Sequence, residues 1–185
     1  MPSWTPKFCW ELTADCKIRL KDETAWGVSG APARNTVLVE FSAYYIRSNT
    51  ERLEVQLPQN PVLVTEVIVP TIHGDGDYEV VMEVFNMEGD FLKPPIRYRI
   101  LIMCSLKACF CRLDALILDA TCGCEPDKLF DLIGKIRVIM DGSATLYSVG
   151  DYEMARQLLE YGGGLCASFG KSSGGCGGGC GGGCH

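Results

Sequence analysis

The chain has 185 residues, a mass of 20.2 kDa and a formal net charge of −6 at pH 7. This length predicts one or two small domains, and a hydrophobic fraction of 47% is enough for a packed core. The acidic pI, near 4.9, argues against a nucleic-acid-binding surface. Charged side chains interrupt the most apolar stretch, Ile96 to Leu118, so no membrane span is expected. The N-terminus lacks the apolar run of an export signal, which predicts synthesis in a cytosol.

Residues 1–103 are expected to form an antiparallel β-sandwich domain, with its strands between residues 12 and 103. Short segments here alternate polar and apolar side chains, so each has one buried and one solvent-facing side. Six or seven short strands with turns at this spacing are typical of a sandwich. The segments are Cys16–Leu20, Thr36–Ile46, Arg52–Leu57, Val62–Val69, Tyr78–Phe85 and Ile96–Met103.

Near Cys104 the apolar spacing changes to three and four residues, which predicts helices. A helical hairpin or three-helix unit is therefore expected over residues 104–162, and the fold class is α+β. Gly142 is expected to weaken the end of the second helix. The predicted helices are Leu106–Ala120, ended by Cys122–Pro126; Asp127–Met140; and Asp151–Tyr161, ended by Gly162–Gly164.

Residues 163–185 form a Gly/Cys-rich tail in which Cys176, Cys180 and Cys184 recur every four residues. Glycine has no side chain to pack and loses the most entropy on ordering, so this tail has no core of its own. If it is ordered, a metal, a disulfide or a neighbouring molecule must order it.

Eleven cysteines in a chain made in a cytosol indicate buried thiols or metal ligands before disulfides. Three helices running up, down and up would gather Cys122, Cys124 and Cys166 at one end, one ligand short of a zinc site. A tail cysteine or His185 could supply the fourth ligand. The candidate zinc ligands are therefore Cys122, Cys124, Cys166, Cys176, Cys180, Cys184 and His185.

Hydrophobic packing is the favoured alternative for the helical cysteines, because cysteine also behaves as a small apolar residue. Core packing is likewise favoured for Cys104, Cys109 and Cys111. For the tail, capture of a metal, thiol contacts with a neighbouring subunit and a plain solvent-exposed segment remain open.

No catalytic constellation is recognised, so we expect no enzymatic activity. A serine hydrolase would have to use His73, in the loop Thr71–Asp77, and the chain has no Gly-x-Ser-x-Gly motif. Asp75 and Asp77 lack the acidic spacing of a calcium loop, so an ordinary turn is favoured.

The order of parts over residues 70–166 resembles a known class of protein. Asp75–Asp90 looks like the late hairpin of an immunoglobulin or fibronectin type III-like sandwich. Arg97–Leu113 is a strand running into a Cys-bearing helix, followed by Cys122-Gly-Cys124, a second helix, Gly150–Tyr161 and Cys166. This arrangement is similar to virion structural proteins of tailed bacteriophages, including those of crAss-like and related large phages.

The resemblance implies a non-enzymatic component of the connector, neck or tail ring, present in many symmetry-related copies. Its partners would be copies of itself and other virion structural proteins. It would reside in the virion after synthesis in the host bacterial cytoplasm. Two other hypotheses stand beside it: a zinc-binding adaptor or regulatory protein using the C-terminal cysteines, and a hydrolase using the loop at residues 71–77.

Overall fold

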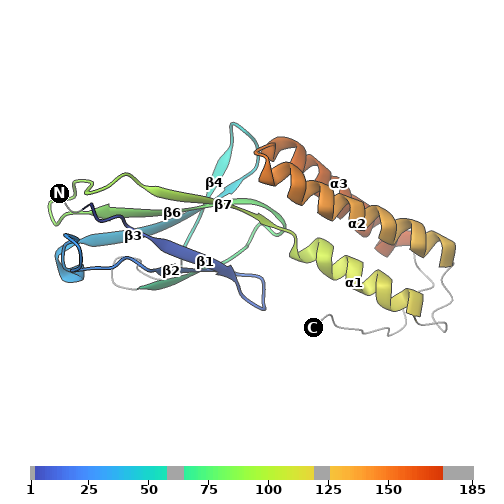
Figure 1. The fold of residues 1–185 in the computed structure, drawn as a ribbon. Coiled ribbons are helices and arrows are strands. Elements are labelled where there is room, and N and C mark those ends of the chain that lie inside the picture. The colour runs from blue at the N-terminus through green and yellow to red at the C-terminus, as the bar shows by residue number, and fades with distance from the viewer. Residues whose placement is uncertain (1–2, 58–64, 119–125, 173–185) are drawn as a thin grey trace. The chain divides into compact units, whose positions relative to one another are not determined.

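The structure is a computed structural model that describes residues 3–57, 65–118 and 126–172 (Figure 1). The fold is α+β, with antiparallel strands first in the chain and helices after them. It divides into two compact units. Unit 1 comprises Met1–His73 and Tyr78–Ile100, and unit 2 comprises Gly74–Asp77 and Leu101–His185.

The described strands form two antiparallel sheets. One sheet has the order β1-β2-β5 and the other has the order β4-β3-β6-β7. The strands are β1 (Phe8–Leu12), β2 (Ile18–Asp22), β3 (Leu38–Ile46), β4 (Arg52–Val55), β5 (Glu66–Val69), β6 (Gly76–Phe85) and β7 (Ile96–Ile102).

Alternating apolar side chains from both sheets build the core of unit 1. In β2, Ile18 and Leu20 are fully buried, and they pair with Val69 and Val67 of β5. Phe8 of β1 makes an edge-to-face contact with a ring of the other sheet, because its centroid lies 5.6 Å from that of Phe41 on β3. The predicted period of two therefore identified the buried side of β2 and β3.

Strand β1 lies before the first predicted strand. Of its five residues only Phe8 is buried, so its sequence gives almost no alternation to recognise. Its register, from Phe8 opposite Asp22 to Leu12 opposite Ile18, is set by pairing with β2. Tertiary pairing rather than local pattern defines this strand.

Three helices form the core of unit 2: α1 (Cys104–Leu118), α2 (Pro126–Ser148) and α3 (Tyr152–Ser172). Figure 1 shows α2 and α3 as an antiparallel hairpin with α1 alongside α2. Gly150, with φ of 85°, makes the tight turn between α2 and α3. The buried residues of this core are Leu106, Cys109, Leu113, Leu129, Ile136, Ile139 and Leu159. Among the described helices, none is both long enough and apolar enough to cross a bilayer.

Two predictions about glycine in these helices were wrong. α3 does not end at Gly162–Gly164 but continues to Ser172, and α2 continues past Gly142 to Ser148. A Cβ added at Gly162 would lie 2.8 Å from Ile139 Cγ2, and one at Gly142 would lie 2.9 Å from Leu158 Cδ2. These two glycines let α2 and α3 approach closely, and the packing gained outweighs their low helix propensity.

The close approach at Gly162 predicts a position-specific cost. Gly162→Val should destabilise unit 2 by about 1–3 kcal/mol, because the new side chain must displace Ile139 and Leu106. Gly163→Val is the matched control, since a Cβ there meets nothing within 4 Å. Denaturation followed by far-UV circular dichroism measures both variants. Equal stability of the two would contradict the packing role of Gly162.

Candidate functional site

Asp75 caps the first helix from a distant part of the chain. Its two carboxylate oxygens accept hydrogen bonds from the backbone N–H groups of Ser105 and Leu106, each at 2.8 Å. These N–H groups belong to the first turn of α1 and have no partner within the helix. A carboxylate at this end is also favoured by the helix dipole. Asp75 thus fixes where α1 begins.

Asp77, two residues later, is fully buried and accepts hydrogen bonds from two helices of unit 2. Tyr147 of α2 donates its hydroxyl to Asp77 Oδ1 at 2.7 Å. Arg156 of α3 donates from its guanidinium to Asp77 Oδ2 at 2.9 Å, and its own side chain is only 11% exposed. The segment Gly74–Asp77 therefore ties all three helices together.

These contacts bear on the hydrolase hypothesis. The carboxylates of Asp75 and Asp77 are both engaged with unit 2, whereas the ring of His73 stacks on Tyr45 of unit 1 with centroids 4.7 Å apart. His73, Asp75 and Asp77 each make a structural contact with a different partner rather than with one another. The role of both aspartates was not predictable from the sequence, since their partners lie 30 or more residues away in the chain.

Removing the buried carboxylate should be costly. Asp77→Ala removes one partner of the buried Asp77–Arg156 ion pair, and breaking such a pair typically costs about 3–5 kcal/mol. Tyr147→Phe removes one neutral donor and should cost about 1 kcal/mol. Because the three α-helices lie in unit 2, loss of the helical circular dichroism signal during denaturation measures the unfolding of that unit.

The matched control is Asp131→Asn, which breaks an ion pair whose side chains are 54% and 65% exposed and should change stability little. An Asp77→Ala variant as stable as Asp131→Asn would contradict the tie between Asp77 and the helices.

Disulfides replace the free thiols expected at five positions. Cys109 of α1 is bonded to Cys166 of α3, with their Cα atoms 6.3 Å apart. Cys16, Cys104 and Cys111 are also disulfide-bonded. The expectation of thiols or metal ligands at these positions was wrong. Spacing alone did not reveal that Cys109 and Cys166, 57 residues apart, face each other across the bundle.

Within the described residues, Cys9 is a free thiol. Partial burial, followed by its interaction with Glu23, raises the pKa of the Cys9 thiol. A raised pKa lowers the thiolate fraction, so Cys9 is a poor nucleophile and a poor metal ligand at neutral pH.

Six of the seven candidate zinc ligands lie outside the described residues: Cys122, Cys124, Cys176, Cys180, Cys184 and His185. The seventh, Cys166, is bonded to Cys109, and a disulfide sulfur is not the thiolate that binds zinc. In the part of the chain that the structure describes, no three His, Cys, Asp or Glu side chains are grouped as a metal site requires.

The disulfide between α1 and α3 predicts a selective loss of stability. Cys166→Ala should destabilise unit 2 by about 4 kcal/mol, because a closed loop of this length restricts the unfolded chain. All three tryptophans lie in unit 1, so their fluorescence separately reports that unit. Cys9→Ala is the matched control. Unchanged unfolding of the helices would contradict the bond.

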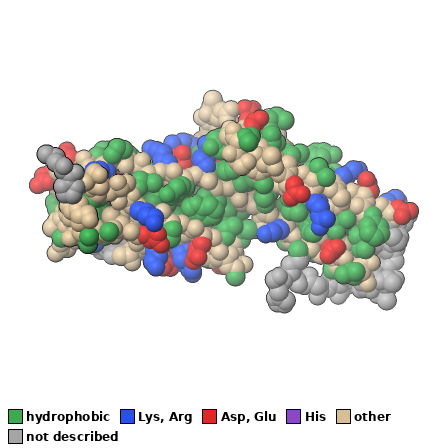
Figure 2. All heavy atoms as spheres, in the orientation of Figure 1, with side chains coloured by type: hydrophobic (Ala, Val, Ile, Leu, Met, Phe, Trp, Pro, Cys, Tyr) green, Lys and Arg blue, Asp and Glu red, His purple; other side chains and the backbone are tan. Residues whose placement is uncertain are grey.

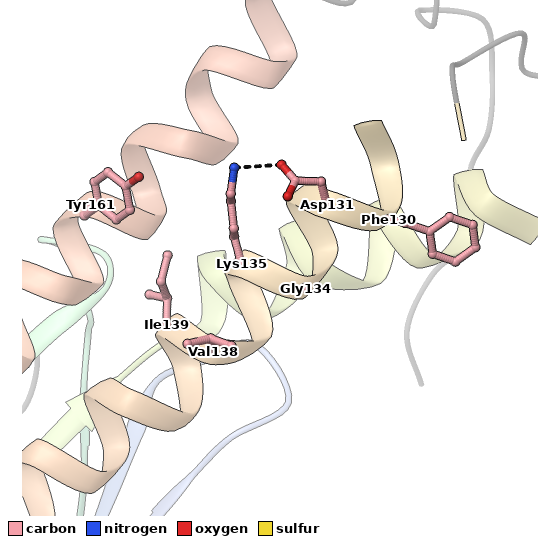
Figure 3. A pocket seen from close by; sticks show the side chains of 7 residues that line it. All are labelled: Phe130, Asp131, Gly134, Lys135, Val138, Ile139 and Tyr161. Atoms are coloured by element: carbon pink, nitrogen blue, oxygen red, sulfur yellow. Dashed lines mark hydrogen bonds and ion pairs between the residues drawn. The ribbon is translucent and has the colours of Figure 1, made fainter. Parts of the chain in front are cut away.

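Two hollows flank the outer surface of α2. A groove of about 600 Å³ lies between α2 and α3 (Figure 3), and a smaller one of about 150 Å³ lies beside α1. Phe130 and Gly134 line both hollows. Figure 2 shows hydrophobic side chains interspersed with charged ones on the surface that it draws. The larger groove is lined by Phe130, Asp131, Gly134, Lys135, Val138, Ile139 and Tyr161.

The larger groove is the candidate functional site, because its rim exposes large apolar side chains. Val138 is 70% exposed, Tyr161 59% and Phe130 57%. Between them Lys135 donates to Asp131 Oδ2 at 2.7 Å. The groove is open to solvent and has both apolar and charged side chains in its lining. Such a surface suits binding of another protein more than enclosure of a small molecule.

No family model matches the chain, and no curated protein matches it.

Proposed function

We propose that the chain is a non-enzymatic structural protein of a tailed-phage particle. It acts in the connector, neck or tail region and is present in many symmetry-related copies. The observation that carries this proposal is the exposed apolar surface beside the groove between α2 and α3. Exposed apolar residues gathered around a groove are typical of protein contact surfaces.

The finer fold assignment belongs to the same proposal. Unit 1 is an immunoglobulin or fibronectin type III-like β-sandwich. Its two sheets support this assignment. One contains β1, β2 and β5, and the other contains β4, β3, β6 and β7 in that order. Such an order requires the chain to cross between sheets, as Greek-key sandwiches do. A sandwich of this kind supplies a rigid body on which contact surfaces can be placed.

Two aspartates support a structural role: Asp75, which immediately precedes β6, and Asp77, which lies within it. Asp75 and Asp77 are engaged in capping α1 and pairing with Arg156, rather than converging on an open pocket. A protein that keeps its shape within a particle benefits from such fixed contacts.

The disulfides fit a virion. Disulfides persist on virion surfaces and in other oxidising settings, whereas the cytosol keeps thiols reduced. The chain would be made in the host bacterial cytoplasm, and the Cys109–Cys166 bond would form afterwards. Its partners are copies of itself and other virion structural proteins.

Labelling of purified particles tests this function. An antibody raised against the full chain should bind washed particles of the phage that encodes it, at one fixed position in the connector, neck or tail. Mass spectrometry of the same particles should find several copies per particle. Pre-immune serum is the control. A chain abundant in the infected lysate but absent from washed particles would rule the proposal out.

A further inference from the structure

The last part of α3 is packed less deeply than the first. In the first part Leu159 is buried, and Arg156 is paired with the buried Asp77. Among residues 163–169, by contrast, no side chain is fully buried. We call residues 163–172 the α3 end. Three half-buried side chains pack it against the helical core: Leu165, Cys166 and Phe169.

Two glycines weaken the helix where the α3 end begins. Gly163 and Gly164 are exposed, and a Cβ added at either position would meet nothing within 4 Å. Close packing therefore accounts for Gly162 but not for these two. Each glycine in a helix interior disfavours the helix about fivefold relative to alanine. The α3 end is thus joined to the rest of α3 through a segment that favours helix poorly.

The disulfide lies directly beyond these glycines. It joins Cys166 to Cys109 of α1, and Cys109 is only 3% exposed and belongs to the helical core. While the bond is intact, Cys166 stays beside α1, so the α3 end closes again after any local opening. Without the bond, packing of the α3 end depends mainly on Leu165 and Phe169.

We propose that the Cys109–Cys166 disulfide is a redox-sensitive switch for the α3 end. With the bond intact, the α3 end is helical and packed on the bundle. With the bond reduced, the α3 end unwinds and separates from α1, while residues 152–161 stay helical. A reducing compartment therefore keeps the α3 end open, and an oxidising one closes it. The switch does not depend on the proposed function, because it is a property of the purified chain.

A dithiol reductant supplies the chemistry, and Cys166 is the more accessible sulfur. Cys166 is half-buried, whereas Cys109 is 3% exposed, and the residues three and four positions before Cys166 are glycines without side chains to cover it. A thiolate of the reductant bonds to Cys166 Sγ, the S–S bond breaks, and its electron pair leaves on Cys109 Sγ. The second thiolate of the reductant then displaces Cys166 Sγ and closes the reductant's own disulfide. Each departing sulfur takes one proton that the reductant's thiols released.

Hydrogen exchange of the backbone amides tests the switch in the full chain, with and without dithiothreitol. Amides 165–172 should exchange about 30-fold faster or more after reduction, which corresponds to the lower end of the stabilisation that a disulfide gives. Amides 156–161 of the same helix are the internal control and should keep their protection. Equal protection of the α3 end in both states would overturn the inference, and so would equal loss in both parts of α3.

A double variant isolates this bond from the others. Dithiothreitol also reduces the disulfides of Cys16, Cys104 and Cys111. Cys109→Ala combined with Cys166→Ala, measured without reductant, leaves those bonds intact and should reproduce the rapid exchange of the α3 end. Circular dichroism checks that the variant is folded. Full protection in this variant would show that a different disulfide holds the α3 end and would overturn the inference.

The glycines provide the opposite test. In the reduced chain, Gly163→Ala combined with Gly164→Ala should slow exchange of the α3 end about 25-fold, because each alanine favours the helix about fivefold. Gly134→Ala is the matched control. Gly134 is also an exposed helical glycine with nothing within 4 Å of an added Cβ, but it lies in α2, so the α3 end should still exchange rapidly.

If the two alanines change nothing, or the control slows exchange equally, the switch is wrong. These measurements use the purified chain, so their failure leaves the proposed function in place. Washed particles without the chain would remove the function and leave the switch.

Discussion

Asp77 is fully buried, and its carboxylate receives hydrogen bonds from Tyr147 and Arg156, which lie on two different helices. A buried charge is tolerated only when it is paired and hydrogen-bonded, so these side chains have little freedom to rearrange. Asp75, two residues earlier, fixes the start of α1. The short segment Gly74–Asp77, from the strand-rich half of the sequence, thus specifies through its two aspartates how three helices meet. Burial of apolar surface drives the helices together, and these polar contacts select one arrangement.

Much of the fold could be predicted from the sequence, because periodicity reports which side of an element is buried. The alternation in β2 and β3 and the change of period near Cys104 located the strands and the first helix. The failures share one cause. Local propensity predicted that Gly162 ends a helix and that Gly142 weakens the end of one, whereas contacts between α2 and α3 decide the role of both. Phe8–Leu12 had too little pattern of its own, and its pairing with β2 makes it a strand.

The candidate site was less predictable. The number and spacing of the cysteines suggested metal binding. The partner of Cys109 is determined by helix packing, which the spacing of cysteines in the sequence does not reveal. The signal for the groove was present in the sequence. Phe130 and Val138 fall outside the apolar stripe that contains Leu129 and Ile136, and apolar residues off the core side of a helix indicate a second contact. The placement of Tyr161 at the groove and the pairing of Asp131 with Lys135 were visible only in the structure.

The bond between Cys109 and Cys166 also determines how the chain bears tension. A pull between the strands and the C-terminus would pass through the first residues of α1, cross the disulfide and leave through the last turns of α3. All of α2 lies inside the covalent loop and carries none of that load. Fully extended, the 57-residue separation would otherwise add about 190 Å of chain. While the disulfide is intact, the bundle behaves as a short, nearly inextensible link, and the surface of α2 keeps its shape under strain.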